Sequence, residues 1–363
     1  MNLEQLDTPV LLVDQDALKR NLERMLKIIS RTGVTYRPHA KAHKSPDIAR
    51  MQLEYGAIGI CCAKLGEAEV FAEEGIDDIL ITSPVIGASK ISRLIELSSK
   101  ACVTVVVDNE ENVRDLARFS EAGGIHLKII IEINVGQNRC GVEPGQAALS
   151  LAQFVQNTNN LTLIGLQGYN GSIQMLKSFK RRNIETQKSM LSLTEAADCI
   201  RNSDQNFSVL TGGGTGTSII DAKAGFLNEI QPGGYVFMDS CYKNVSWENG
   251  KKIPFEQSLT VMSSVISSPS SKRVILDMGL KSISSDQGPP MIVDLPHAKF
   301  KFAGEEHAEL FWEEENCPLK IGDKIRFVPS HCDTTVNLYD NFIVHSGNSV
   351  TNIWPIAARG KSQ

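Results

Sequence analysis

The strongest constraint on the fold is a unit that recurs along the first two thirds of the chain. Each unit has a short apolar run, a polar corner and a stretch with apolar residues at helical spacing. Apolar runs bounded by turn residues are typical of buried strands, and the spacing that follows is typical of amphipathic helices. The runs cover residues 34–41, 56–64, 78–85, 102–109, 127–135, 161–168, 207–212 and 230–239, and helical stretches between them include 45–55, 66–74, 88–99 and 111–122.

Eight strands that alternate with helices predict the α/β class with a parallel sheet. The count of eight favours a (β/α)8 TIM barrel. A doubly wound open sheet is the alternative, but the glycine pattern of a dinucleotide-binding fold does not follow the first strand. We therefore expect residues 16–248 to form a barrel that begins with a helix near Asp16.

The pattern changes after about residue 245, where short strand-like runs are separated by turns rich in serine, proline and glycine. Helical spacing largely disappears there. We expect residues 249–363, together with residues 1–15 and their strand at 8–15, to form a mostly β second domain. The short runs cover residues 261–266, 273–276, 324–328 and 341–345.

The composition excludes several classes of protein. The chain has 363 residues and a formal net charge of −5 without a long basic tract, so no nucleic-acid partner is expected. No apolar run approaches transmembrane length, and the N-terminus lacks the features of a signal peptide, so no membrane partner is expected. The eight cysteines include no CxxC pair, which favours reduced thiols in the cytoplasm over disulfides or a structural zinc cluster.

The densest group of cations follows the first barrel strand, in Arg-Pro-His-Ala-Lys-Ala-His-Lys at residues 37–44. Pro38 favours a strand end over a helix, and alternation beyond it predicts that His39, Lys41 and His43 project to one side. Clustered cations lower one another's pKa, so Lys41 is a candidate amine nucleophile that forms a Schiff base. A basic patch on a solvated loop is the alternative.

Other notable residues follow later strands, at the end of the barrel where active sites of this fold lie. Arg139 follows the fifth strand, Tyr169 the sixth, and a glycine-rich run at residues 211–217 the seventh. Successive glycines let backbone N–H groups face one concavity, which suits an anion such as phosphate. The hydroxyls of Thr215 and Thr217 can add donors. A flexible linker is the alternative for this run.

The segment at residues 37–44 resembles the cofactor-lysine segment of the D-threonine aldolase and D-serine dehydratase-like family, and the likeness extends over nearly the whole chain. Members of this family are pyridoxal 5'-phosphate enzymes on the alanine-racemase-type barrel, also called fold type III. The resemblance implies that Lys41 carries the cofactor. It implies further cofactor contacts from Arg139, at the phenolic oxygen, and from Tyr169, Thr211, Gly213, Gly214, Gly233 and Tyr235.

A second candidate site is Ser-His-Cys-Asp at residues 330–333. Alternation predicts His331 and Asp333 on one side and Cys332 on the other. An imidazole and a carboxylate suit a divalent metal and leave coordination positions open. The segment resembles the metal segment of the family, in which His-x-Asp is typical of aldolases with manganese or magnesium and His-x-Cys of dehydratases with zinc. Some hydroxyaspartate dehydratases share His-x-Asp, so the motif leaves the reaction open.

One position departs from the family pattern. Aldolases of the family often carry a histidine after the glutamine that corresponds to Gln174, and here that residue is Met175. Because methionine cannot transfer protons, either a metal-bound water acts alone, or another residue substitutes, or the substrate differs. His307 is another family-like histidine, and no role is assigned to it.

These features predict a lyase of the D-threonine aldolase type, which cleaves a D-3-hydroxy amino acid to glycine and an aldehyde with Lys41, His331 and Asp333 as catalytic residues. The main alternative is a dehydratase that gives a 2-oxo acid and ammonia. A non-catalytic cofactor carrier would lack the β domain, and a racemase would not need the metal. From the family we expect a homodimer, in which the β domain of one chain covers the barrel mouth of the other.

Overall fold

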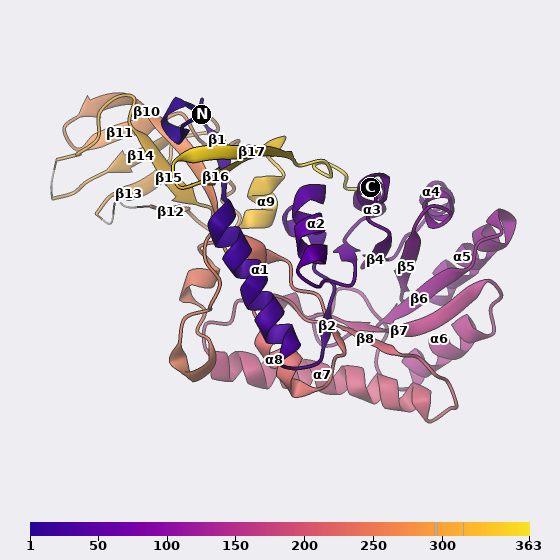
Figure 1. The fold of residues 1–363 in the computed structure, drawn as a ribbon. Helices are drawn as coiled ribbons and strands as arrows, with labels where there is room; N and C mark the ends of the chain where they lie inside the picture. The colour runs from indigo at the N-terminus through magenta and orange to yellow at the C-terminus, as the bar shows by residue number, and fades with distance from the viewer. Residues whose placement is uncertain (294, 296, 315) are drawn as a thin grey trace.

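The computed structural model describes residues 1–293, 295, 297–314 and 316–363, and these residues form two sheets (Figure 1). The first has eight parallel strands in the order β2-β9-β8-β7-β6-β5-β4-β3, so strands from β3 to β9 are neighbours in chain order, as in a barrel. The strands are β2 (Thr35–Tyr36), β3 (Ile60–Cys62), β4 (Asp78–Ile81), β5 (Cys102–Val107), β6 (Leu127–Glu132), β7 (Leu161–Gly168), β8 (Val209–Gly212) and β9 (Glu229–Ile230).

The two edges of this sheet are joined, so the sheet closes into a barrel. The N–H of Cys61 donates to the carbonyl of Pro38 at 2.9 Å, and the N–H of Ile58 donates to the carbonyl of Tyr36 at 3.1 Å. His39 and Cys61 form a parallel bridge between the edges. The expected (β/α)8 architecture is thereby confirmed.

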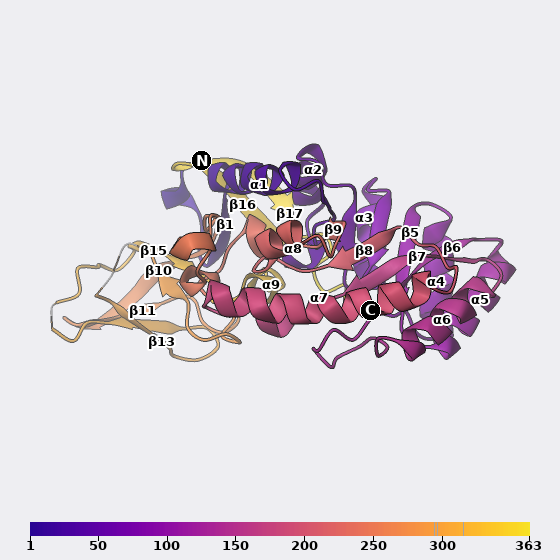
Figure 2. The same ribbon diagram turned by 90° about the horizontal axis from the view of Figure 1, so that it is seen from below.

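Helices cover the outside of the barrel, and Figure 2 shows the longest, α7, running from the second sheet toward α6. Their amphipathic spacing places residues such as Leu22 and Leu116 in the core. No helix in the described part of the chain is both long enough and apolar enough to cross a membrane. The helices are α1 (Gln15–Ser30), α2 (Pro46–Glu54), α3 (Leu65–Glu73), α4 (Ala88–Ser98), α5 (Glu110–Gly123), α6 (Gln146–Gln156), α7 (Phe179–Arg201) and α8 (Ser218–Ala224).

Two of the barrel strands are shorter than their apolar runs. β2 gives way to the 3-10 helix η2 (Ala40–Ala42), and β9 is followed by the 3-10 helix η4 (Gly234–Val236). The two turns pack closely, because a Cβ atom on Gly233 would lie only 2.8 Å from the carbonyl oxygen of His39. Backbone pairing continues beside this contact, because the N–H of His39 donates to the carbonyl of Pro232 at 3.2 Å, and both turns line the same cavity.

The second sheet combines the first strand of the chain with the C-terminal strands. β1 (Val10–Asp14) lies between β10, which is antiparallel to it, and β16, which is parallel. All five expected strands are present, and β12, β13, β14 and β17 extend the sheet. The strands are β10 (Leu259–Ser270), β11 (Arg273–Leu276), β12 (Met291–Ile292), β13 (Lys299–Phe302), β14 (Ala308–Phe311), β15 (Lys324–Val328), β16 (Asn341–Ser346) and β17 (Ser349–Pro355), and the short helix α9 (Cys332–Val336) follows β15.

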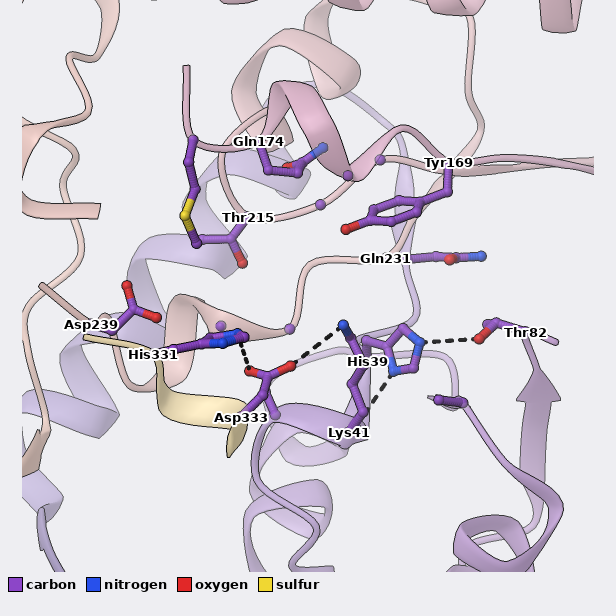
Figure 3. Close-up of a pocket in the computed structure, with 18 of the residues that line it drawn as sticks. His39, Lys41, Thr82, Tyr169, Gln174, Thr215, Gln231, Asp239, His331 and Asp333 are labelled. Atoms are coloured by element: carbon purple, nitrogen blue, oxygen red, sulfur yellow. Dashed lines mark hydrogen bonds and ion pairs between the residues drawn. The ribbon is translucent and has the colours of Figure 1, made fainter. Parts of the chain in front are cut away.

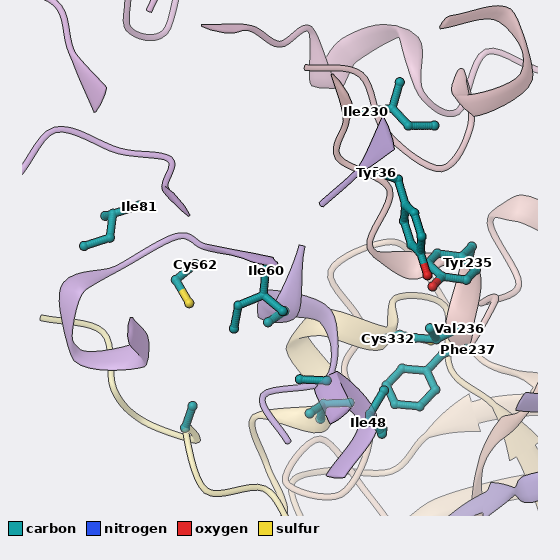
Figure 4. Close-up of a cluster of buried hydrophobic side chains, with 14 of the residues drawn as sticks. Tyr36, Ile48, Ile60, Cys62, Ile81, Ile230, Tyr235, Val236, Phe237 and Cys332 are labelled. Carbon is teal, nitrogen blue, oxygen red and sulfur yellow. The ribbon is translucent and has the colours of Figure 1, made fainter. Parts of the chain in front are cut away.

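A shared apolar core joins the barrel to the second sheet. Figure 4 shows Tyr36, Ile48, Tyr235 and Phe237 in this core, around the turns that carry η2 and η4. The ring of Phe237 packs on the ring of Phe342 in β16, with the centroids 5.4 Å apart. Both rings are fully buried, so the packing between the two sheets also supports the turns at the barrel end.

We expect Phe237→Ala to lower the free energy of unfolding by about 3–5 kcal/mol, the usual cost of removing a buried phenylalanine ring. The substitution would leave a void where the barrel meets the second sheet. Urea denaturation measures the change. Ile353→Ala is the control, because that side chain is 59% exposed, and it should lose less than about 1 kcal/mol. A loss at Phe237 no larger than the control would contradict a shared core.

Candidate active site

A cavity of about 470 Å³ lies at the carboxyl ends of the parallel strands, next to the second sheet (Figure 3). Its walls come from the loops after β2, β6, β7, β8 and β9 and from the start of α9. Most of the expected site residues meet here. Those that line the cavity are Lys41, Arg139, Tyr169, Gly213, Gly214, Gly233, His331 and Asp333.

Lys41 reaches the cavity from η2, whose backbone is held on both sides. His39 Nδ1 accepts a hydrogen bond from the N–H of Lys41 at 3.4 Å, and His39 Nε2 lies 3.1 Å from Thr82 Oγ1. Beyond the turn, the buried ammonium of Lys44 pairs with the carboxylate of Glu67. Lys44 has a φ of 52°, in the left-handed region, and the ion pair helps to hold it there. Lys41 is therefore presented to the cavity by a fixed turn.

The contact between Lys41 and Asp333 is central to the cavity. Lys41 Nζ lies 3.4 Å from Asp333 Oδ2. The Asp333 carboxylate raises the pKa of Lys41 above its ordinary value, against the opposing effects of burial and of Arg139. The expectation that clustered cations lower this pKa is therefore wrong, because the nearest charge is negative.

The cationic segment divides between cavity and core, contrary to the expected alternation. His39 and Lys41 line the cavity, but His43 is fully buried with its Nε2 3.2 Å from Gln52 Oε1. The turn causes the difference, because a 3-10 helix rotates successive side chains by about 120° rather than 180°. Burial lowers the pKa of both imidazoles, to about 4 for His43, so neither adds a positive charge at neutral pH.

His331 and Asp333 lie at the start of α9, and their side chains approach each other in the cavity (Figure 3). His331 Nε2 is 4.0 Å from Asp333 Oδ1. Cys332 is buried outside the cavity lining, in agreement with the expected separation. The separation arises from a helical turn, however, and not from strand alternation.

Asp286 is a residue of this site that the sequence reasoning misses. Its Oδ2 lies 2.6 Å from His331 Nδ1. Burial alone would raise its pKa, but hydrogen bonds from Ser284, His331 and Thr334 lower it to about 2. The ionised carboxylate therefore favours a proton on Nδ1 and leaves Nε2 available as a ligand. Its sequence context of serine, glutamine and glycine is typical of a turn and carries no signal of function.

Asp239 is a second missed residue, and Figure 3 shows it beside His331, on the side away from Lys41. Its Oδ2 accepts from the N–H of Cys332 at 3.3 Å, and its Oδ1 accepts from the N–H of Tyr242 at 3.3 Å. Burial raises the pKa of Asp239 to about 6. Its place at the end of the eighth apolar run was the available signal, because functional residues of barrels lie at strand ends.

The pair His331 and Asp333 could hold a divalent metal. Metal-binding histidines usually donate their second N–H to a carboxylate, and His331 has Asp286 in that place. Nowhere among the described residues do three or more His, Cys, Asp or Glu side chains cluster as a metal site. A metal on this pair would keep open positions for water or substrate, as a catalytic site requires.

The glycine-rich loop after β8 forms the opposite end of the cavity. Gly213 has a φ of 70°, and a Cβ atom there would overlap Asp221 Oδ2. A Cβ atom on Gly214 would lie 2.7 Å from Gln174 Oε1. The groups packed behind the loop therefore require glycine at these positions, and the front of the loop faces the cavity.

Part of this loop is already hydrogen-bonded within the protein. Gln174 Oε1 accepts from the N–H of Gly216 at 3.1 Å and from the N–H of Thr217 at 3.3 Å. The hydroxyl of Thr217 donates to Asp221, so the expectation that it serves an anion is wrong. Around this loop and the turn before η4, the cavity-lining residues whose backbone N–H groups have no partner among the described residues include Thr215, Gly233 and Gly234.

Two expected cofactor contacts lie in the layer beneath the cavity. Tyr235 is fully buried, and its hydroxyl lies 3.3 Å from Gln52 Nε2, so its ring belongs to the core in Figure 4. Thr211 is also buried, and its hydroxyl donates to Glu229 at 2.7 Å. Neither side chain lines the cavity. Both side chains therefore support the cavity wall from beneath, whereas a direct contact with the cofactor was expected.

The side wall of the cavity carries Arg139 and Tyr169, with the guanidinium carbon 5.5 Å from the ring centroid. Arg139 Nη2 lies 4.0 Å from Glu132 Oε1, and burial raises the pKa of Glu132 to about 7. Met175 also lines the cavity. His307 is exposed between β13 and β14, far along the second sheet, and is not part of the cavity lining.

Comparison with known proteins agrees with this geometry. Residues 13–241 match the family described as "Alanine racemase, N-terminal domain", and residues 258–345 match the one described as "Putative serine dehydratase domain". The chain is 38% identical to a D-threonine aldolase of Arthrobacter sp., over 99% of this chain and 95% of the relative. It is 36% identical to a 3-hydroxy-D-aspartate aldolase of Paracoccus denitrificans strain Pd 1222, over 99% and 94%. The crystal structure of D-threonine aldolase from Filomicrobium marinum superposes with a TM-score of 0.97 at 36% identity, covering 100% of this chain and 98% of that one.

A parallel barrel with a lysine after its first strand, joined to a mostly antiparallel sheet, defines the alanine-racemase-type class. The two family matches fall on the barrel and on the second sheet, and the relatives align from end to end. The chain therefore belongs to the D-threonine aldolase and D-serine dehydratase-like family within that class, as its motifs predicted.

Asp221, behind the glycine-rich loop, makes stability depend on pH. The residue is 1% exposed, its Oδ1 has no partner among the described residues, and burial raises its pKa to about 7. The folded state therefore binds this proton more tightly than the unfolded chain does. The contribution to stability is fully present below about pH 4 and is lost as the pH rises to about 7.

Asp221→Asn should remove this contribution. We expect the difference in the free energy of unfolding, variant minus natural sequence, to increase by on the order of 1–4 kcal/mol between about pH 4 and pH 7. Urea denaturation at several pH values measures the difference. Asp77→Asn, at an exposed side chain, is the control and should follow the natural sequence. Parallel pH profiles for Asp221→Asn and the natural sequence would disprove the assignment.

Proposed function

We propose that the chain is a lyase of the D-threonine aldolase type, which cleaves the Cα–Cβ bond of a D-3-hydroxy amino acid to give glycine and an aldehyde. The observation that supports the proposal is one cavity that brings together an amine, an imidazole–carboxylate pair and a glycine-rich loop. Lys41 Nζ lies 3.4 Å from Asp333, and the glycine-rich loop lines the same cavity. Aldolase relatives at 36% and 38% identity over the whole chain support this reaction.

The first cofactor of the proposed reaction is pyridoxal 5'-phosphate, which membership of the alanine-racemase-type family implies. The residues fit it. Lys41 supplies the amine for covalent attachment, and the N–H groups of Thr215, Gly233 and Gly234 can hold the phosphate group. When bound, this cofactor stabilises the negative charge that develops on Cα. Arg139 lines the same cavity beside Tyr169, where it can orient the ring of the cofactor.

The second cofactor is a divalent metal on His331 and Asp333, which lowers the pKa of a hydroxyl group that it binds. Manganese or magnesium is favoured over zinc, because the carboxylate is a hard ligand and the Cys332 thiol lies outside the cavity lining. Asp286 holds the His331 ring in orientation. Asp333 would hold the metal through the carboxylate whose Oδ2 lies 3.4 Å from Lys41 Nζ, so the metal would lie close to the amine.

Met175 gives the cavity lining an apolar side chain where a histidine is often found in the family. The polar lining residues include the carboxylates of Asp239 and Asp333, the phenol of Tyr242 and the imidazole of His331. The substrate hydroxyl would therefore face carboxylates in place of a second imidazole. This arrangement requires the metal for proton removal more strictly than one with a histidine would.

We expect Lys41→Ala to abolish the visible absorption band of the lysine-bound cofactor and to abolish turnover, because no other lysine among the described residues lines the cavity. Absorption spectra and product assays of the purified protein measure both. Lys90→Ala, at an exposed lysine on α4, is the control and should keep the band. Borohydride reduction followed by peptide mapping identifies the attachment point, and labelling of Lys44 in place of Lys41 would refute the assignment.

We expect chelation to abolish turnover but to leave the cofactor band and the melting temperature nearly unchanged, because two ligands cannot hold a fold together as a closed four-ligand site does. Asp333→Ala should behave like chelation, and Cys332→Ser should remain active. With metal restored, glycine and an aldehyde should accumulate in equal amounts from a D-3-hydroxy amino acid. A 2-oxo acid and ammonia without glycine would indicate a dehydratase, and full activity after exhaustive chelation would exclude the metal.

A further inference from the structure

Arg182, near the start of α7, is the largest fully buried side chain among the described residues, and its hydrogen-bond partners are backbone carbonyls. Nε donates to the carbonyl of Gly216 at 2.8 Å, Nη1 to that of Leu176 at 2.5 Å, and Nη2 to that of Ser246 at 2.5 Å. Every nitrogen of the guanidinium group is therefore engaged in holding a loop.

These three carbonyls belong to three loops that meet beside the cavity. Gly216 lies in the glycine-rich loop, next to Thr215, and Leu176 follows Met175 in the loop after β7. Ser246 lies in the connection from the barrel to the second sheet. Thr215 and Met175 line the cavity, so two of the three residues held by Arg182, Gly216 and Leu176, directly follow lining residues. One side chain thus sets the spacing of the loops at this end.

The positive charge of Arg182 has no carboxylate partner in the described part of the chain. Burial lowers the pKa of the guanidinium, yet arginine stays protonated in proteins. Asp221 lies behind the same loop, but it accepts from Thr217 and its pKa is raised toward neutrality, so it is not the counter-ion. A buried cation without an anion is costly, and an anion held by the front of the loop would offset that cost.

We infer that Arg182 is a positioning residue for the phosphate group of the cofactor: it fixes the glycine-rich loop and supplies, through that loop, the charge that balances the phosphate. This inference rests on the proposed function, because it concerns the same cofactor. The inference has a specific consequence. Loss of Arg182 weakens the binding of a ligand that carries a phosphate group more than the binding of the same ligand without it.

Binding of pyridoxal 5'-phosphate and of pyridoxal, which lacks the phosphate, tests this consequence. Each is titrated into the full-length protein freed of cofactor, and the ratio of the two dissociation constants gives the phosphate selectivity. Arg182→Gln should reduce this selectivity about tenfold or more, because it removes a charge and most of the fork of donors. Arg182→Lys keeps the charge but cannot reach three carbonyls, so it should show a smaller loss. Arg181→Gln, the exposed neighbour on α7, should retain full selectivity.

If Arg182 has a purely structural role, Arg182→Gln weakens the binding of both ligands equally. The phosphate selectivity then stays at its natural value, and this result would overturn the inference. If that variant does not fold, unchanged selectivity in Arg182→Lys has the same meaning. Hydrogen exchange of the natural protein needs no variant: the phosphate-bearing ligand should protect the loops around Leu176, Gly216 and Ser246 more than pyridoxal does, and equal protection overturns the inference. Failure of the natural protein to bind pyridoxal 5'-phosphate would instead contradict the proposed function.

Discussion

The cavity depends on an ion pair between residues that are almost three hundred positions apart in sequence. Lys41 comes from the first turn of the barrel and Asp333 from the helix that follows β15. The two side chains are 43% and 24% exposed, so solvent screens their attraction and the pair adds little to stability. Its importance is geometric. It brings the amine of the barrel and the imidazole–carboxylate pair beside the second sheet into one small volume, where a single substrate can contact both.

The rigidity that this weak pair needs is supplied by buried contacts around it. The Lys44–Glu67 ion pair fixes the chain after η2, and the close packing of Gly233 on His39 fixes the turn opposite. Phe237 and Phe342 join the barrel to the second sheet beneath both turns. The side chains of the cavity interact only weakly with one another. They are held in place by a scaffold whose stability comes from apolar burial.

Much of the fold could be predicted from the sequence, because eight apolar runs with intervening helical spacing leave few alternatives to a barrel. Lys41, His331 and Asp333 were predicted because each lies in a compact motif. Asp286 and Asp239 were not, since their roles arise only when distant loops meet at His331. The short strands β12 to β14 have two to four residues, too few for a periodic signal. Local turns also decided details that alternation could not, as the separate environments of Lys41 and His43 illustrate.

The place of β1 in the second sheet has a consequence for how the chain is made. This strand is translated before every strand of the barrel, yet both of its neighbours, β10 and β16, are translated after the barrel is complete. During synthesis of the whole barrel, β1 has two unpaired edges and an apolar sequence, Val-Leu-Leu-Val, that cannot yet be buried. Unpaired strand edges of this kind are sites of misassociation between chains. Completion of the second sheet therefore waits for β16, and until then the edges of β1 remain open to pairing with other chains.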